Sequence, residues 1–424
     1  MITYNPPQGP RAPKTALDLL NAVIPLLKQD YSGDLEDLVV NIRDFVPDSP
    51  RHLETVTAHL KFAIQSFFAL VEATTNALAS SVLGSSPRVP NSDLAVLQER
   101  EYDEESDRCL DSPRHYSLLT RSQAAFRSFL SACHAPPRPN WDPETLEHFA
   151  TLALARKRFT HPKRLEHLSP VWAYESFRQV ARWFPEEVVM ALAGAARGLG
   201  LTLSPVPLNL NELPPGAAIQ DPSTVFNKGF DNYIFSSPGA AIAYIDQFSQ
   251  RLDFDLRMSL SFCSSAQEQQ IGRAIRRVIR TIAITTEGEL AFASYFMRAV
   301  AHRGDGKIFV QQQVKGESVP SRLARASSAF STAFGSGFQP VARGKSWEDL
   351  HNVFSLRDRL VHPRRPKDIE LDRSHLSIAM SGLHWLVENS FPALSNLDEQ
   401  KIANLVGSRL PSSTRSRRSI TGPE

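Results

Sequence analysis

Two stretches of this chain, "ARKRFTHPKR" (155–164) and "LRDRLVHPRR" (356–365), place the same kinds of residue at the same spacing. In each, an arginine stands five positions before a histidine, and that histidine is followed by proline and two basic residues. Of the twelve histidines, His161 and His362 are the only two with either feature. The repetition indicates a duplicated site.

The residue types in these stretches suit phosphate chemistry. Arginine stays charged and presents a planar fork that matches two phosphate oxygens. Histidine titrates near neutrality and can accept or donate a proton at physiological pH. RNA cleavage by the 2′-hydroxyl needs both functions, one to take the proton and one to stabilise the charge at phosphorus. The motifs therefore predict phosphate chemistry that needs no metal and no cofactor.

Helical geometry also predicts where these residues lie relative to the end of their helix. Positions five apart are about 140° out of register on a helix, so Arg357 and His362 are expected where a helix ends. Asp358 lies four residues before His362 and shares its face, so its carboxylate could hold one imidazole nitrogen. Lys157 stands at the matching position before His161 and cannot accept that hydrogen bond. The two copies should therefore differ chemically, with the stronger catalysis at His362.

The expected roles divide into two groups. The catalytic candidates are Arg156, His161, Arg357, Asp358 and His362. The basic residues expected to contact the substrate phosphates are Lys157, Lys163, Arg164, Arg364 and Arg365.

The elements around the motifs repeat as well. Apolar periodicity and capping residues predict helices at 51–83, 116–132, 142–160 and 174–199, and again at 267–302, 321–334, 346–361 and 376–391. Aromatic landmarks recur in the same order in both sets: Phe126, Trp141 and Trp183, then Phe330, Trp347 and Trp385. The chain is expected to be all-α, with two tandem four-helix bundles packed as an intramolecular pseudo-dimer.

The predicted domains are 51–202 and 241–410. A leader with a short helical segment precedes them (1–50), and a proline-rich connection with one or two short strands joins them (203–240). A polar, acidic insertion is expected at 84–115 and a disordered basic tail at 411–424.

Composition limits the classes of function. A net charge of +2 excludes a general polycation, so affinity for nucleic acid must come from local basic clusters. Three widely spaced cysteines argue against a disulfide framework and a thiolate metal site. The apolar run at 186–203 contains Arg197 and falls short of a membrane-spanning helix. We expect a cytoplasmic protein without a membrane anchor.

The motif resembles that of the HEPN superfamily (higher eukaryotes and prokaryotes nucleotide-binding), in which arginine, a polar residue, a short spacer and histidine end one helix of a four-helix bundle. "RDRLVHP" is similar to the family pattern, whereas "RKRFTHP" departs from it at Lys157. The resemblance implies a metal-independent endoribonuclease with a composite site from two bundles, acting in defence or as a toxin. It also implies RNA as substrate, and it leaves room for an antitoxin or other regulatory protein and for a homo-oligomer.

Simpler interpretations stay open at this point. The two histidines could be cations at helix ends that complement the helix dipole, worth about 0.3–1 kcal/mol. The basic residues could form a solvated face, and Trp183 and Trp385 belong more naturally to the core. Glu72 and Glu287, each on the first helix of its repeat, could reach the site or serve packing. The alternative function is a non-catalytic HEPN-like module that binds a nucleotide, an RNA or a protein.

Overall fold

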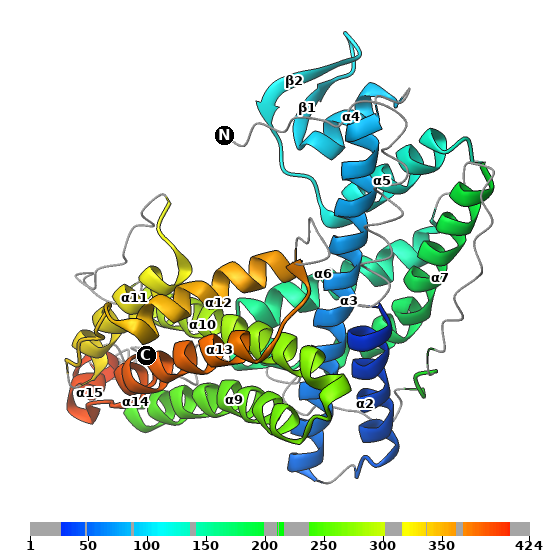
Figure 1. Ribbon diagram of the computed structural model, residues 1–424. Helices are drawn as coiled ribbons and strands as arrows, with labels where there is room; N and C mark the ends of the chain where they lie inside the picture. Colours follow the sequence, from blue (N-terminus) through cyan, green and yellow to red (C-terminus); the bar gives the residue numbers. More distant parts are fainter. Residues whose placement is uncertain are drawn as a thin grey trace, which may run out of the picture.

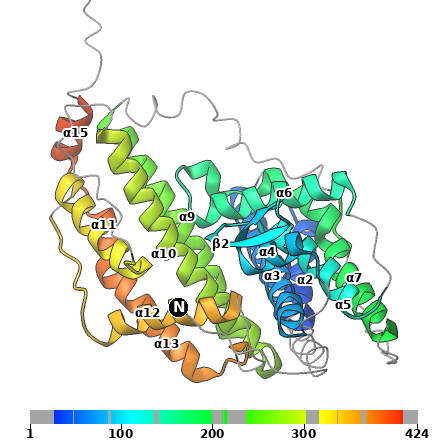
Figure 2. The same cartoon turned by 90° about the horizontal axis from the view of Figure 1, so that it is seen from above.

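The computed structural model describes residues 27–46, 49–85, 89–135, 141–198, 210, 212–215, 237–301, 316–335, 337–361 and 368–407. These residues are mostly helical, as expected from the sequence. Helices before residue 200 gather on one side and helices after residue 237 on the other (Figures 1 and 2).

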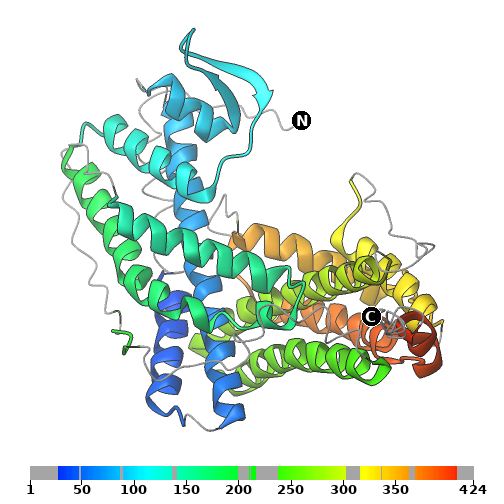
Figure 3. The same cartoon turned by 180° about the vertical axis from the view of Figure 1, so that it is seen from behind.

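The first half contains the four expected helices with their bounds shifted by a few residues. Its main elements are α2 (Ser32–Arg43), α3 (Pro50–Ser85), α5 (Leu118–Ala132), α6 (Pro143–Thr160) and α7 (Tyr174–Gly198). Short helical turns flank them: η1 (Leu27–Tyr31), η2 (Leu165–Leu168) and η3 (Val171–Ala173). The segment expected to be a polar insertion contains α4 (Asn91–Gln98) and an antiparallel hairpin of β1 (Arg100–Asp103) and β2 (Arg108–Pro113), beside one end of α3 (Figure 3).

The second half repeats the order and adds helices. Its elements are α9 (Pro238–Ser265), η6 (Glu268–Gln270), α10 (Ile271–Ala301), α11 (Val319–Phe334), α12 (Lys345–Val361), α13 (Arg373–Trp385), η8 (Leu386–Ser390), α14 (Phe391–Ser395) and α15 (Glu399–Gly407). Helix α9 was not predicted as a helix, although Ser237 caps it and Pro238 occupies its first turn. The stretch 223–237, where one or two short strands are expected, lies outside the described residues except for Ser237, as do the leader before residue 27 and the tail at 411–424.

Local sequence explains the bounds of the helix that carries the first motif. The Asp142 side chain accepts a hydrogen bond from the Thr145 backbone N–H, and Pro143 follows in the first turn. At the other end, Thr160 is the last helical residue and His161 is the C-cap. Pro162 cannot continue the hydrogen-bonded ladder. The motif histidine therefore stands where α6 ends, as the five-residue spacing predicts.

Each half has its own hydrophobic core, with the aromatic landmarks in matching places. Trp141 contacts Trp183 with ring centroids 4.8 Å apart, and Trp347 contacts Trp385 at the same 4.8 Å. Trp385 is 1% exposed, and Trp183 is partly buried against the first core. The interpretation of these tryptophans as packing residues is confirmed.

Helix α3 is long and apolar enough to cross a membrane by length and composition alone. In the fold, 78% of its most apolar window is buried against other helices. That burial is what the central helix of a water-soluble bundle shows. No other helix among the described residues passes the same test.

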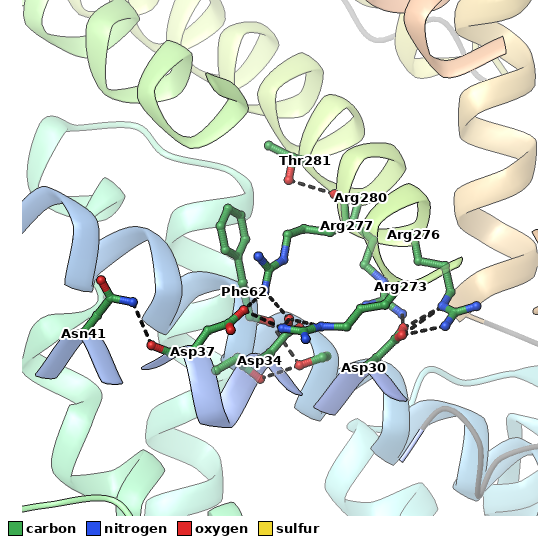
Figure 4. Close-up of polar contacts among 12 residues, drawn as sticks. Asp30, Asp34, Asp37, Asn41, Phe62, Arg273, Arg276, Arg277, Arg280 and Thr281 are labelled. Atoms are coloured by element: carbon green, nitrogen blue, oxygen red, sulfur yellow. Dashed lines mark hydrogen bonds and ion pairs between the residues drawn. The ribbon is translucent and has the colours of Figure 1, made fainter. Parts of the chain in front are cut away.

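Charged side chains join the two halves in a reciprocal way. Asp30 of η1 and Asp34 and Asp37 of α2 face an arginine row on α10, which consists of Arg273, Arg276, Arg277 and Arg280 (Figure 4). In the opposite direction, Lys61 of α3 binds Asp255 of α9, with Nζ 2.6 Å from Oδ2. Each half therefore supplies carboxylates that neutralise buried cations of the other.

The centre of this network is Asp34, which is 3% exposed. Its carboxylate accepts hydrogen bonds from Arg273, with Oδ1–Nη2 3.1 Å, and from Arg277. Burial alone would raise the pKa of Asp34, but the guanidinium groups of Arg277 and Arg273 outweigh burial and hold it at about 2. Asp34 is therefore ionised throughout the physiological pH range.

We expect Asp34→Ala to lower the free energy of unfolding by about 3–5 kcal/mol, because it leaves buried arginines short of counter-charge. Urea denaturation measures this loss. Asp253→Ala is the matched control, since its partner Arg257 is 78% exposed and such surface pairs contribute little. A loss of unfolding free energy no larger than that of Asp253→Ala would contradict the central role given to Asp34 in this network.

The lowered pKa of Asp34 also determines how the free energy of unfolding depends on pH. The folded-state pKa of Asp34 lies below its unfolded value of 3.8, so its contribution is fully present above pH 4 and is lost as pH falls towards 2. Each pKa unit corresponds to about 1.4 kcal/mol.

Candidate functional site

A pocket lies where four helices meet, two from each half. Its walls come from α3 and α6 of the first half and from α10 and α12 of the second. The described lining residues are Gln65, Ala69, Arg156, Thr160, Arg280, Ile284, Arg357 and Val361. Both motif arginines therefore line one pocket, which is hereafter called the central pocket.

The two halves contribute to the central pocket from matching positions. Gln65 and Ala69 are four residues apart on α3, and Arg280 and Ile284 are four apart on α10. Three residues after Ala69 and Ile284, the same helices carry Glu72 and Glu287. On α6 and α12, the lining residues are the motif arginine and the residue just before the motif histidine.

Arg156 is held from two sides within the first half. Its Nη1 donates to Oε1 of Glu72 on α3, and its guanidinium lies over the Phe68 ring at 5.1 Å from the centroid. The Arg156 side chain is 28% exposed. The group is thus fixed in direction while part of it stays accessible to a ligand.

Arg357 has the equivalent partner in the second half. Its Nη2 is 3.3 Å from Oε1 of Glu287 on α10, and its Nη1 is 3.1 Å from Oδ1 of Asp358. Glu72 and Glu287 therefore reach the motifs, each at the arginine of its own half. Asp358 is 63% exposed and contacts Arg357. The predicted contact between Asp358 and His362 lies outside the described residues.

His161 meets a carboxylate from the other half. Its Nδ1 lies 4.0 Å from Oε2 of Glu287, an ion-pair distance when the imidazole is protonated. Among the described residues, this Oε2 atom accepts no hydrogen bond, although Glu287 is only 7% exposed. The carboxylate of Glu287 thus lies between Arg357 and His161.

Close packing brings His161 to Glu287. The neighbouring Pro162 is buried against α10 beside Gly288. A Cβ at Gly288 would lie 3.2 Å from Leu252 Cδ2 and 3.5 Å from Pro162 Cγ. The end of α6 thus packs closely on α10 at this turn, one residue from Glu287.

The protonation of His161 follows from its surroundings. Burial lowers the pKa of His161 below 6.5; Glu287 acts in the opposite direction, and the nearby cations led by Arg357 support the lowering. The side chain is still 55% exposed. At neutral pH the imidazole is therefore mainly neutral, which is the form that can accept a proton.

Arg280 belongs to the site but was not predicted from the sequence. It is 7% exposed and lines the central pocket. Its Nη2 has one distant carboxylate contact, with Asp30 Oδ2 at 3.4 Å, and its Nε has no hydrogen-bond partner among the described residues. The central pocket is thus lined by three guanidinium groups, one of which is buried with little counter-charge.

A sequence signal for this residue existed. The stretch "RAIRRVIR" (273–280) places four arginines at helical spacing on one face, and "DYSGDLED" (30–37) does the same for three aspartates. Two complementary charged stripes far apart in the chain indicate a contact between their helices.

No family model, no curated protein and no solved structure matches the chain. The site must therefore be interpreted from its own geometry.

The remaining predicted residues fall into three groups. Lys157 is exposed in the last turn of α6, and Arg164 pairs with Glu166, with Nη1–Oε1 3.7 Å. Lys163 is exposed and lines a second pocket together with His161. His362, Arg364 and Arg365 lie outside the described residues. Among the described residues, no group of three or more His, Cys, Asp or Glu side chains could hold a metal ion.

Proposed function

We propose that this protein is an endoribonuclease of HEPN type that cleaves RNA without a metal ion, in the role of defence or toxin effector that the resemblance implies. The observation that carries the proposal is the convergence of the two motif arginines, Arg156 and Arg357, on the central pocket. They come from helices of different halves, about two hundred residues apart.

The proposed architecture is an intramolecular pseudo-dimer of domains 51–202 and 241–410. The matched lining of the central pocket supports it, as do the equal tryptophan contacts in the two cores. The reciprocal ion pairs are a third indication, because Lys61–Asp255 and Arg276–Asp30 each join the long helix of one half to a helix of the other. A two-fold related pair of units shows such reciprocity.

In the proposed reaction, the scissile phosphate occupies the central pocket. His161, neutral at physiological pH, takes the proton from the 2′-hydroxyl, and the 2′-oxygen forms a bond to phosphorus. The bond from phosphorus to the 5′-oxygen breaks, and that oxygen receives a proton from a second acid, the role proposed here for His362. Arg156, Arg280 and Arg357 stabilise the charge on the non-bridging oxygens.

The proposal predicts three results for purified protein and labelled RNA. Cleavage should persist in excess chelator, since no step uses a metal. The fragments should carry 2′,3′-cyclic phosphate or 3′-phosphate and 5′-hydroxyl ends. DNA of the same sequence should stay intact, because it lacks the attacking hydroxyl. Activity lost in chelator, or 5′-phosphate ends, would instead indicate attack by metal-activated water.

One observation favours the second candidate, a non-catalytic module that binds a nucleotide, an RNA or a protein. Both motif arginines already bind carboxylates, Arg156 with Glu72 and Arg357 with Glu287, as structural ion pairs do. A parent protein that binds RNA without cutting it would establish this alternative.

A further inference from the structure

A second pocket adjoins the site on the side of the second half. It lies between the end of α6, α10 and the first turns of α11. Its polar lining consists mainly of His161, Lys163, Tyr295, Arg298, Arg322 and Arg325. Glu287 lines it too, so this flanking pocket begins where the proposed general base stands.

The cations that line the flanking pocket differ in their ion-pair partners among the described residues. Arg325 pairs with Glu317. By contrast, within the described part of the chain the side chains of Lys163, Arg298 and Arg322 form no salt bridge with a carboxylate. These three residues come from a loop and two different helices, yet they converge on one concavity. Such convergence raises the local potential and favours an anion.

The flanking pocket also has an apolar part. Leu290 and Val319 contribute to its wall, and Tyr295 is half-buried on α10. A flat aromatic ring beside apolar atoms suits a nucleobase, and arginines beside it suit a phosphate. Few ligand classes other than a nucleoside phosphate need both.

We propose that the flanking pocket binds one nucleotide of a single-stranded RNA, next to the linkage held in the central pocket. This inference rests on the proposed function, which sets the orientation of the bound strand towards His161. Tyr295 contacts the base, and Arg298 and Arg322 contact the phosphate. A free nucleotide offers the same chemistry, so the strand and the mononucleotide must be tested separately.

The test measures binding, not cleavage. A fluorescein-labelled, fully 2′-O-methylated RNA octamer cannot undergo 2′-hydroxyl attack, so its fluorescence anisotropy reports affinity alone. We expect Arg298→Ala and Arg322→Ala each to raise Kd about tenfold and to reduce the slope of log affinity against log salt by about 1. Tyr295→Ala should raise Kd by roughly 5- to 150-fold, whereas Tyr295→Phe should keep most of the affinity.

Arg257→Ala is the matched control, because Arg257 is an exposed arginine of the same half that does not line the flanking pocket. Unchanged Kd in the Arg298, Arg322 and Tyr295 variants would overturn the proposal. Competition by mononucleotides as effective as unlabelled octamer would overturn the strand assignment and identify a free nucleotide as the ligand.

Failure of the flanking-pocket proposal can be distinguished from failure of the proposed nuclease function. If the parent protein cuts RNA but the pocket variants keep parental Kd and KM, the flanking pocket is excluded and the nuclease stands. If the parent cuts no RNA but the variants bind the octamer more weakly, the pocket stands and the nuclease is excluded.

Discussion

Replacing His161 by alanine is expected to lower the rate of RNA cleavage by roughly 10²–10⁴-fold, the usual contribution of a general acid–base group. The reason is that His161 is mainly neutral at pH 7 and stands beside a buried carboxylate from the other half. His148→Ala is the control, since this histidine of α6 contacts Ser176 and does not line either pocket described above. Single-turnover rates with saturating protein separate this loss from weaker binding.

The role of Glu287 has a separate signature in the pH profile. If neutral His161 is the base, activity rises with pH along a limb centred below pH 6.5, the ordinary histidine value. Glu287 favours the protonated imidazole, so Glu287→Gln should move that limb to lower pH. A purely structural role would lower the rate without moving the limb. An unmoved limb would leave Glu287 with a structural role only, and a His161→Ala rate equal to that of His148→Ala would remove His161 from the mechanism.

Arg357→Lys is expected to lower cleavage by about 10²–10³-fold even though the positive charge is kept. A lysine ammonium cannot reproduce the planar fork that contacts Glu287 and Asp358 and still presents donors to a phosphate. Arg359→Lys is the matched control, because Arg359 is exposed two residues later on α12. The measurement is kcat/KM on a defined RNA substrate.

The matched lining of the central pocket adds a comparison to this prediction. The loss of kcat/KM for Arg156→Lys should lie in the same range as that for Arg357→Lys, because Arg156 lines the central pocket from the matching position. Losses at both arginines no greater than that of Arg359→Lys would show that the ion pairs with Glu72 and Glu287 serve packing.

The sequence allowed much of the scaffold to be predicted because its signals are local. Asp142 and Pro143 mark the start of a helix, and the Arg–His spacing marks its end at Thr160. The paired tryptophans indicated the repeat before their contacts were known. Helix α9 was missed because its stretch joins the end of a proline-rich connection.

The partners of the site residues could not be predicted in the same way. Helical spacing points to a partner four residues before each histidine, and before His161 that residue is Lys157, which has no carboxylate. The carboxylate near His161 is Glu287, more than a hundred residues away, and tertiary packing at Gly288 brings it there. Arg280 was not predicted as a site residue because the arginine stripe at 273–280 indicates a contact between helices and does not show that a pocket lies beside it.

The exchange of carboxylates between the halves also bears on how the two copies can diverge. In a symmetric homodimer, one sequence must satisfy both positions at every contact. Once the two units share a chain, Asp30 and Asp255 can change independently, as can the groups that they neutralise. Lys157 already stands where the other copy has Asp358. If the proposed pseudo-dimer holds, selection can change the two halves of the central pocket separately, whereas in a homodimer each substitution appears in both subunits.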